Sequence, residues 1–305
     1  MRRLPVWSWL WFGLGAVYFV LPLWATLDFS LRMRRGVLSL DAYQSAVTDP
    51  KFIETFLYSN QMAVLTIVVS VLLIVPTAFW VHLRLPQLRP VVEFITQLPF
   101  VIPAIILVFG LIKTYSSPLT VFTVDLVPPL TNSVFSTNLL MVAGYTVLSL
   151  PYMYRAVDNG LRAMDVRSLT EAAQSLGASW FVILFRIILP NLRTALLSGA
   201  LLTFAIVVGE LTIATFLGRP AFGPYLALLG NHRAYEPAAL TIISFALTWM
   251  AMGLIQLVTR GAQGRGHLGA DHDVGIRQGV DQGFGQDRVL DEEGRQGGPL
   301  LHRQI

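Results

Sequence analysis

The sequence predicts an all-α polytopic membrane protein with six transmembrane helices. Hydrophobic residues make up 54% of its 305 residues and charged residues only 13%, whereas a soluble domain carries about 25% charged residues. Six stretches are apolar and long enough to cross a bilayer, which takes about 20 residues. The expected spans, which together form a transmembrane domain over residues 1–260, cover about 5–27, 59–81, 92–111, 134–154, 194–217 and 237–258.

The first two spans are defined by long runs without charge. The residues from Leu4 to Leu27 are all uncharged. A secretory signal has a shorter apolar core and a small-residue cleavage site, so we predict an uncleaved helix. Its tryptophans are typical of residues at a membrane interface. A polar loop from Asp28 to Lys51 then leads to residues 55–81, which contain no acidic or basic side chain.

The third span contains two prolines, Pro99 and Pro103. A proline inside a span leaves backbone carbonyls unpaired and kinks the helix. This kink is either a packing feature or a hinge that lines a transport pathway. The fourth span is followed by a more polar segment, residues 155–193, and a loop rich in Gly and Pro, residues 219–235, separates the fifth span from the sixth.

The polar segment has the pattern of two helices joined by a sharp turn. Ser168 and Glu171 match an S-x-x-E capping box, so a helix is expected to begin directly after Ser168. Gly177 can adopt the left-handed conformation that ends a helix after about two turns. Ser179 is a good N-cap for a second helix, and Pro190 is expected to stop that helix.

The residue identities in this segment carry a resemblance. The run Glu171-Ala172-Ala173, then Gly177, then Ile188-Leu189-Pro190 resembles the EAA loop of the membrane-spanning subunits of binding-protein-dependent (type I) ABC importers. The resemblance implies the MetI-like permease fold, with cytoplasmic coupling helices between spans 4 and 5, here residues 156–190. In that family the loop docks into a groove on the ATP-hydrolysing subunit.

The resemblance also implies partners and a location. The partners are a dimer of ABC ATPase subunits, a second permease subunit (similar or identical), an extracytoplasmic solute-binding protein and membrane lipid. The location is the bacterial cytoplasmic (inner) membrane, with both structured termini cytoplasmic; Lys and Arg near the span ends favour this orientation only weakly. The basic residues are scattered, so no nucleic-acid partner is expected.

No enzymatic activity is expected of this chain. It lacks a Gly-rich nucleotide-binding loop followed by Lys and Ser or Thr, so ATP and Mg would be used by the partner ATPase and no cofactor is expected here. It contains no cysteine, which excludes thiol nucleophiles and Cys metal sites. The function predicted is therefore coupling and passage of a solute.

The expected contact with the ATPase lies in the EAA loop. Glu171 is either a helix cap or a residue that holds the ATPase contact, and the two roles are compatible. Trp180, Phe181 and Phe185 are expected to be buried between the loop and the bundle, with part of their surface meeting the ATPase. The predicted coupling residues are Glu171, Ala172, Ala173, Gly177, Trp180, Phe181 and Pro190.

Glu210 is the only acidic residue inside the predicted fifth span. A carboxylate in a bilayer is costly unless it is paired or hydrated, so it is a functional candidate. It either forms a structural hydrogen bond or lines the substrate path. Tyr145 and Asn138 in the fourth span are weaker candidates for the path.

The predicted solute is a polyamine, because residues 209–218 and the start of the sixth span at Pro237 resemble the spermidine/putrescine permease branch of the family. Permeases for iron(III), thiamine or aminoethylphosphonate are the alternatives within the family. An ion-coupled secondary transporter is the alternative class; it would need discontinuous inverted repeats and no ATPase. A membrane-embedded enzyme would need paired catalytic groups, which the sequence does not show.

Residues 261–305 have a different composition. Eleven of these 45 residues are glycine and aliphatic residues are sparse, which predicts a disordered tail. Their mixture of Arg, Gly, Gln, Asp and His resembles out-of-frame translation, so this tail is either an artefact such as a frameshift or a natural extension. No metal site is predicted from His267 or His272.

Overall fold

The computed structural model describes residues 6–34, 36–121, 124–250 and 253. Its helices are α1 (Val6–Ser30), α2 (Asp41–Thr48), α3 (Pro50–Arg84), α4 (Arg89–Gln97), α5 (Ala104–Tyr115), α6 (Val134–Arg162), α7 (Val166–Ser175), α8 (Trp180–Val182), α9 (Leu189–Asn191), α10 (Arg193–Gly209), α11 (Thr212–Phe216) and α12 (Phe222–His232), followed by Glu236–Met250. The short turns η1 (Pro86–Leu88) and η2 (Leu98–Phe100) and the π-helix η3 (Ile183–Ile188) connect them, and strands β1 (Leu119–Val121) and β2 (Val124–Val127) form one antiparallel hairpin.

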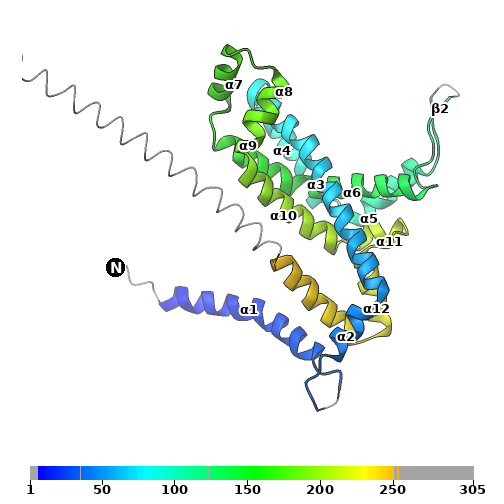
Figure 1. Ribbon diagram of the computed structural model, residues 1–305. Coiled ribbons are helices and arrows are strands. Elements are labelled where there is room, and N and C mark those ends of the chain that lie inside the picture. The colour runs from blue at the N-terminus through cyan, green and yellow to red at the C-terminus, as the bar shows by residue number, and fades with distance from the viewer. Residues whose placement is uncertain (1–5, 35, 122–123, 251–252, 254–305) are drawn as a thin grey trace, which may run out of the picture. The chain divides into compact units, whose positions relative to one another are not determined.

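Helices α3, α6 and α10 form the centre of the part that the structure describes. Figure 1 shows α3 running between α2 and α12 at one end and the α7–α8 segment at the other. Two apolar clusters fill the bundle. The first lies toward α2 and α12 and includes Phe52, Tyr145 and Phe222. The second lies toward α7 and η3 and includes Phe79 and Ile183.

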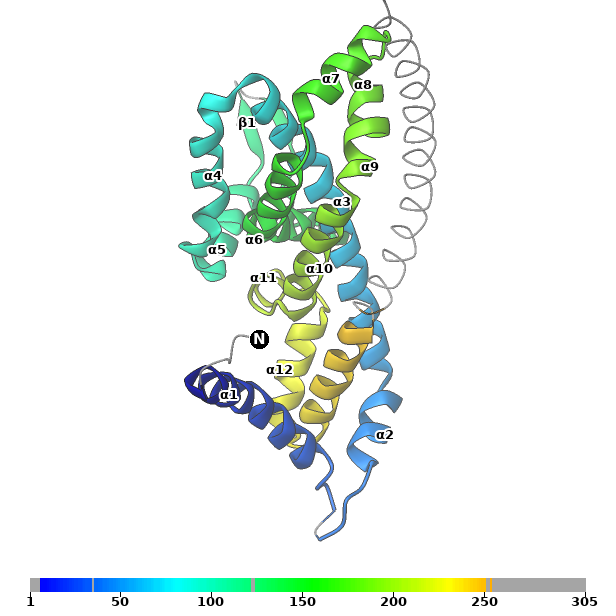
Figure 2. The same ribbon diagram turned by 90° about the vertical axis from the view of Figure 1, so that its left-hand side faces the viewer.

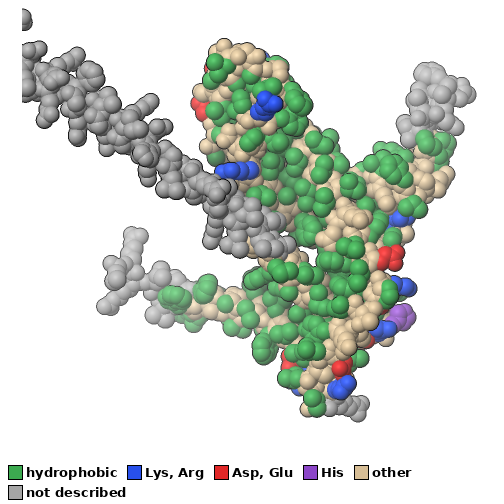
Figure 3. Space-filling model, in the orientation of Figure 1, with side chains coloured by type: hydrophobic (Ala, Val, Ile, Leu, Met, Phe, Trp, Pro, Cys, Tyr) green, Lys and Arg blue, Asp and Glu red, His purple; other side chains and the backbone are tan. Residues whose placement is uncertain are grey.

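Three helices are long and apolar enough to cross a membrane: Trp9–Ser30, Pro50–Arg84 and Val134–Arg162. Two bent helix pairs raise this number to as many as five, and Glu236–Met250 is a shorter apolar helix. The helical class is confirmed, while the number of six spans stays a prediction. Many apolar side chains lie on the surface, as Figure 3 shows for one face, and this suits helices surrounded by lipid.

The second expected span is longer than the sequence indicated. Helix α3 begins at Pro50 rather than near residue 59, because Asp49 accepts a hydrogen bond from the backbone N–H of Lys51 at 3.0 Å and proline occupies the first helical turn. A proline at this position fixes a helical φ without losing an internal hydrogen bond. Lys51, which was expected to end the polar loop, therefore lies in the first turn of α3.

The third expected span, residues 92–111, is not one straight helix. Helices α4 and α5 are separated by η2 and by an extended Pro103, and the two halves are bent by 99°. Pro99 and Pro103 cannot donate the backbone hydrogen bonds that a continuous helix would need at these positions. Figure 2 shows α4 and α5 beside α6, so the break changes the direction of the chain along the bundle.

The fifth expected span, residues 194–217, is also interrupted. Helix α10 ends at Gly209, Glu210 has extended backbone angles (φ −75°, ψ 129°), and α11 begins at Thr212. A second bend of 75° separates the helical segment Trp180–Asn191 from α10. The sequence predicted an unbroken helix because residues 194–209 and 211–217 are almost uniformly apolar, a pattern that does not reveal a break.

Glycines allow α6 and α10 to pack closely. A Cβ atom on Gly160 would lie 2.7 Å from side-chain atoms of both Leu192 and Ala195. A Cβ atom on Gly199 would lie 2.7 Å from the sulfur of Met153. Small residues at a helix crossing bring two backbones together in a membrane protein.

We expect Gly199→Leu to destabilise the α6–α10 crossing. The added side chain has no free space, and overpacking of this kind costs about 1–3 kcal/mol or more. Gly110→Leu is the matched control, because a Cβ atom there meets nothing within 4 Å. Thermal unfolding of the detergent-purified protein measures the difference, and equal midpoints for the two variants would contradict the packing role of Gly199.

Candidate functional site

The first helix of the EAA loop begins earlier than the sequence predicted. Helix α7 starts at Val166 and its N-cap is Asp165, whose carboxylate accepts from the backbone N–H of Ser168 at 3.1 Å and from its hydroxyl at 2.6 Å. These donors hold the pKa of the Asp165 carboxyl below its usual value. The predicted capping box of Ser168 and Glu171 is therefore wrong, because an aspartate three residues upstream takes the capping role.

Glu171 lies on the exposed side of α7 instead. Its carboxylate pairs with Arg167 at 3.0 Å, one helical turn earlier, and both side chains are largely exposed. Such a surface pair contributes little to stability. The neighbouring Ala172 is exposed, whereas Ala173 is buried against η3 and the bundle. The loop thus anchors itself through Ala173 and presents Glu171 and Ala172 outward.

The turn at Gly177 has the geometry that the sequence predicted. Gly177 adopts φ +77°, which a residue with a side chain rarely takes. Its N–H donates to the carbonyl of Gln174 at 2.8 Å, and the N–H of Ala178 donates to the carbonyl of Ala173 at 3.0 Å. This pair of bonds is the Schellman motif, which ends α7 and reverses the chain.

The second helix of the loop is continuous but irregular. Ser179 caps it by accepting from the N–H of Val182 at 3.5 Å, as predicted. The helix then passes through the π-turn η3 into α9 and ends at Asn191. Pro190 lies in its last turn, so the helix stops within two residues of the predicted position. A π-turn of this kind is often found at functional sites.

The aromatic residues of the loop divide into two groups. Trp180 is half-buried against Trp80 of α3, with ring centroids 5.0 Å apart, and the guanidinium of Arg84 lies 5.5 Å from its ring. Phe181 is 70% exposed, and the ring of Phe185, which is also exposed, lies 4.4 Å from it at an interplanar angle of 35°. The expected burial of Phe181 and Phe185 between the loop and the bundle is therefore wrong.

Exposed apolar side chains gather at this turn. Leu176 is 89% exposed, directly before Gly177, and Phe181 and Phe185 follow on the next helix. The sequence did not single out Leu176, because an isolated leucine near a helix end carries no signal. We call Leu176, Phe181 and Phe185 the loop patch. An apolar group of this kind at the surface is typical of an interaction site.

Glu210, the candidate for the solute path, caps a helix in this structure. One oxygen of its carboxylate accepts from the N–H of Thr212 at 2.7 Å, and the other accepts from the N–H of Ile213 at 2.8 Å. The side chain is half-buried and joins the end of α10 to the start of α11. This is the structural hydrogen-bond role that the sequence left open, and the bonds are made to backbone N–H groups at the start of α11.

The two weaker path candidates lie on α6, two turns apart. The amide oxygen of Asn138 accepts from the hydroxyl of Tyr58 at 2.7 Å, and Arg219 donates to the same hydroxyl at 3.3 Å. Tyr145 is buried in the first apolar cluster, and its hydroxyl has no hydrogen-bond partner among the described residues. Tyr145 interacts electrostatically with Glu210 and with Tyr58, and Tyr58 is bonded to Asn138, so the three candidates lie in one region of the bundle.

Comparison with known families decides the class of this protein. Residues 74–262 match the family described as "Binding-protein-dependent transport system inner membrane component". The chain belongs to this family. The matched residues include the whole EAA loop and more than half of the chain, so the predicted family and the multi-pass inner-membrane character are confirmed.

Two curated relatives match this chain at low sequence identity. The spermidine/putrescine transport system permease protein PotB of Haemophilus influenzae is 27% identical over 188 residues, which cover 60% of this chain and 63% of that protein. PotB of Escherichia coli is 27% identical over 201 residues, or 64% and 70% of the two chains. The match therefore spans less than two thirds of the Haemophilus relative.

A solved structure shares the fold. A chain of a bacterial ABC transporter involved in the import of the acidic polysaccharide alginate superposes with a TM-score of 0.57. It is 18% identical, and the match covers 82% of this chain and 94% of that one. This chain therefore shares the fold of that transporter chain.

Proposed function

We propose that this chain is the permease subunit of an ABC importer, that it forms half of a translocation pathway, and that it receives the motion of an ATPase through the EAA loop. The loop patch carries this proposal, because it is an exposed apolar surface at a rigid helix–glycine–helix turn. Family membership supports it, since the family description names binding-protein-dependent transport. The match to the EAA pattern disfavours a secondary transporter, which would need no ATPase.

The proposed partners follow from this role. A dimer of ATPase subunits hydrolyses ATP with Mg, a second permease subunit, similar or identical, completes the pathway, and an extracytoplasmic binding protein delivers the solute. The EAA loop and both structured termini face the cytoplasm. Residues 1–260 form the transmembrane domain, and the predicted tail, residues 261–305, lies outside the described residues. The contacts with the ATPase are made by Glu171, Ala172, Phe181 and their neighbours in the loop.

The proposed solute is a polyamine such as spermidine or putrescine. The names of the two PotB relatives support this class. Uptake of labelled spermidine, competed separately by iron(III), thiamine and aminoethylphosphonate, identifies the solute. If iron(III), thiamine or aminoethylphosphonate competes and putrescine does not, the competing solute, and not a polyamine, is the transported one.

Phe181→Asp tests the ATPase contact. The substitution places a charge in the loop patch and removes an apolar contact, and burial of a phenylalanine contributes about 1.5–3 kcal/mol. We therefore expect at least about a tenfold loss of ATPase subunit recovered with the membrane-extracted permease. Uptake should fall in parallel.

Leu38→Asp is the matched control. Leu38 is equally apolar and exposed, but it lies in the loop between α1 and α2, at the end of α3 opposite the EAA loop. The control should retain the ATPase at the wild-type level. Wild-type recovery of the ATPase with Phe181→Asp would remove the loop patch from the interface, and absence of any ATPase with the wild-type chain would refute the proposed function.

A further inference from the structure

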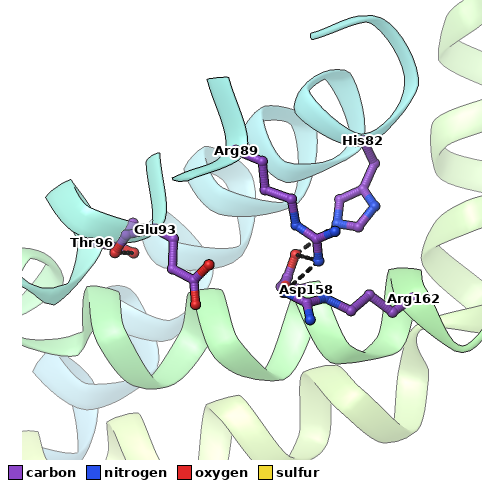
Figure 4. Close-up of polar contacts among 6 residues, drawn as sticks. All are labelled: His82, Arg89, Glu93, Thr96, Asp158 and Arg162. Atoms are coloured by element: carbon purple, nitrogen blue, oxygen red, sulfur yellow. Dashed lines mark hydrogen bonds and ion pairs between the residues drawn. The ribbon is translucent and has the colours of Figure 1, made fainter. Parts of the chain in front are cut away.

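A histidine and two arginines from three segments meet at the carboxylate of Asp158 on α6 (Figure 4). His82, in the last turn of α3, lies 2.7 Å from Oδ1 through Nε2. Arg89, the first residue of α4, donates from Nη2 to Oδ1 at 2.9 Å and to Oδ2 at 3.1 Å. Arg162, one turn along α6, lies 2.7 Å from Oδ2. Because the Arg162 contact lies within α6, we call Asp158, His82 and Arg89 alone the Asp158 cluster.

Asp158 is only 4% exposed. A buried carboxylate needs several charged or polar partners, and removal of one partner from a buried pair is strongly destabilising because a charge remains uncompensated. The contacts that Asp158 makes with His82 and Arg89 are therefore held firmly. They fix the corner between α3 and α4 to the C-terminal end of the long helix α6.

Helix α4 depends on such polar contacts for its position. Thr96 is its only buried residue, whereas Val91, Phe94 and Ile95 are exposed. At its far end, Gln97 accepts from Arg155 of α6 at 3.3 Å. Arg89 at the start and Gln97 at the end thus tie α4 to α6, and Val92 between them packs against the second apolar cluster.

The same turn of α3 that contacts Asp158 also supports the EAA loop. His82 lies between Trp80, which packs on Trp180, and Arg84, whose guanidinium lies over the Trp180 ring. Phe79 and Ile183 share the second apolar cluster, so α3 and η3 are packed together. A displacement of the EAA loop would therefore move the last turn of α3, and with it His82.

We propose that Asp158 is a positioning residue that transmits displacement of the EAA loop to the broken helix α4–α5. The path runs from Trp180 through the last turn of α3 to the Asp158 cluster and then through Arg89 to α4. The 99° break after α4 allows this helix to turn as a unit about η2 and Pro103. The inference rests on the proposed function, because it assigns the element that the ATPase moves.

The test compares two variants that cut the connection with one that does not. Asp158→Asn removes the charge and Arg89→Gln releases α4, while Arg162→Gln removes a contact within α6 alone. All three are made in the complete complex of permeases and ATPase, reconstituted in liposomes with the binding protein. The readout is the number of solute molecules taken up per ATP hydrolysed, which loss of folded protein does not change.

We expect this ratio to fall by about tenfold in Asp158→Asn and Arg89→Gln, within the usual range of coupling between distant sites. Arg162→Gln should keep the wild-type ratio. If Asp158→Asn fails to accumulate, Arg89→Gln carries the test, because it leaves Asp158 with two partners. A wild-type ratio in Arg89→Gln would overturn the inference.

A spectroscopic measurement tests directly whether α4 moves when ATP binds. The chain has no cysteine, so Phe94→Cys on α4 and Phe135→Cys at the start of α6 accept two spin labels at exposed positions, and their distance reports movement of α4 against α6. The distance between the labels should change on ATP binding in the wild-type background and in Arg162→Gln, and stay fixed in Arg89→Gln. An equal change in all three would also overturn the inference. A wild-type complex without ATP-driven uptake would instead refute the proposed function.

Discussion

Gly177→Val should abolish coupling between this permease and its ATPase while leaving the protein in the membrane. The residue adopts φ +77°, and this conformation costs a residue with a Cβ about 1–2 kcal/mol, more when the side chain is β-branched. A Cβ atom at Gly177 meets nothing within 4 Å, so the effect comes from the backbone and not from a clash. The turn would open and displace Leu176 and Phe181, which lie on opposite sides of it.

A strain of this size shifts the equilibrium between the closed and the opened turn by a factor of about 5–30. We expect a loss of similar size in ATPase recovery, measured after detergent extraction, and a larger loss in solute uptake. Gly177→Asn is the matched control, because asparagine tolerates the left-handed region. Equal ATPase recovery and uptake in the Val and Asn variants would show that the turn geometry is not required.

Glu210→Ala should have the second largest effect, on the amount of folded protein. The substitution leaves the N–H groups of Thr212 and Ile213 without their acceptors, and an unpaired buried donor costs about 1–3 kcal/mol. Helix α11 has only five residues and depends on this cap, and Ile213 is part of the first apolar cluster. Membrane abundance and thermal stability should both decrease.

Glu210→Gln separates this structural role from a role in the solute path. Glutamine keeps one acceptor oxygen and replaces the other with a donor, so it should retain intermediate stability. If Glu210 only caps α11, uptake per folded molecule should be the same for Glu and Gln. A loss of polyamine uptake in Gln at wild-type abundance would instead place the charge in the path.

The sequence by itself determined the class and the local form of the EAA loop. Composition and the lengths of the apolar runs predicted a helical membrane protein, because a bilayer requires such runs whatever their neighbours. The positive φ of Gly177 and the cap at Ser179 were predicted because both depend on the nearest few residues. The spacing of Glu171-Ala172-Ala173, Gly177 and Pro190 identified the family that the comparison confirmed.

Neighbouring residues do not determine a structure where two of them can play the same role or where a distant part of the chain decides the outcome. Asp165 displaced Ser168 as the cap of α7, because both residues can cap and only the path of the preceding chain selects one. The exposure of Phe181 could not be predicted, since an aromatic residue in a helix pair is buried or exposed according to the direction in which the loop leaves the bundle.

Tertiary structure alone decided the breaks and the Asp158 cluster. Apolar residues flank Glu210 on both sides, so only the packing of α11 and α12 shows that α10 ends at Gly209. Asp158 meets His82 and Arg89 across 76 and 69 residues of sequence, and no local pattern encodes such pairs. Their contact arises because α3, α4 and α6 pack side by side, which brings a buried carboxylate to the histidine and arginine side chains that pair with it.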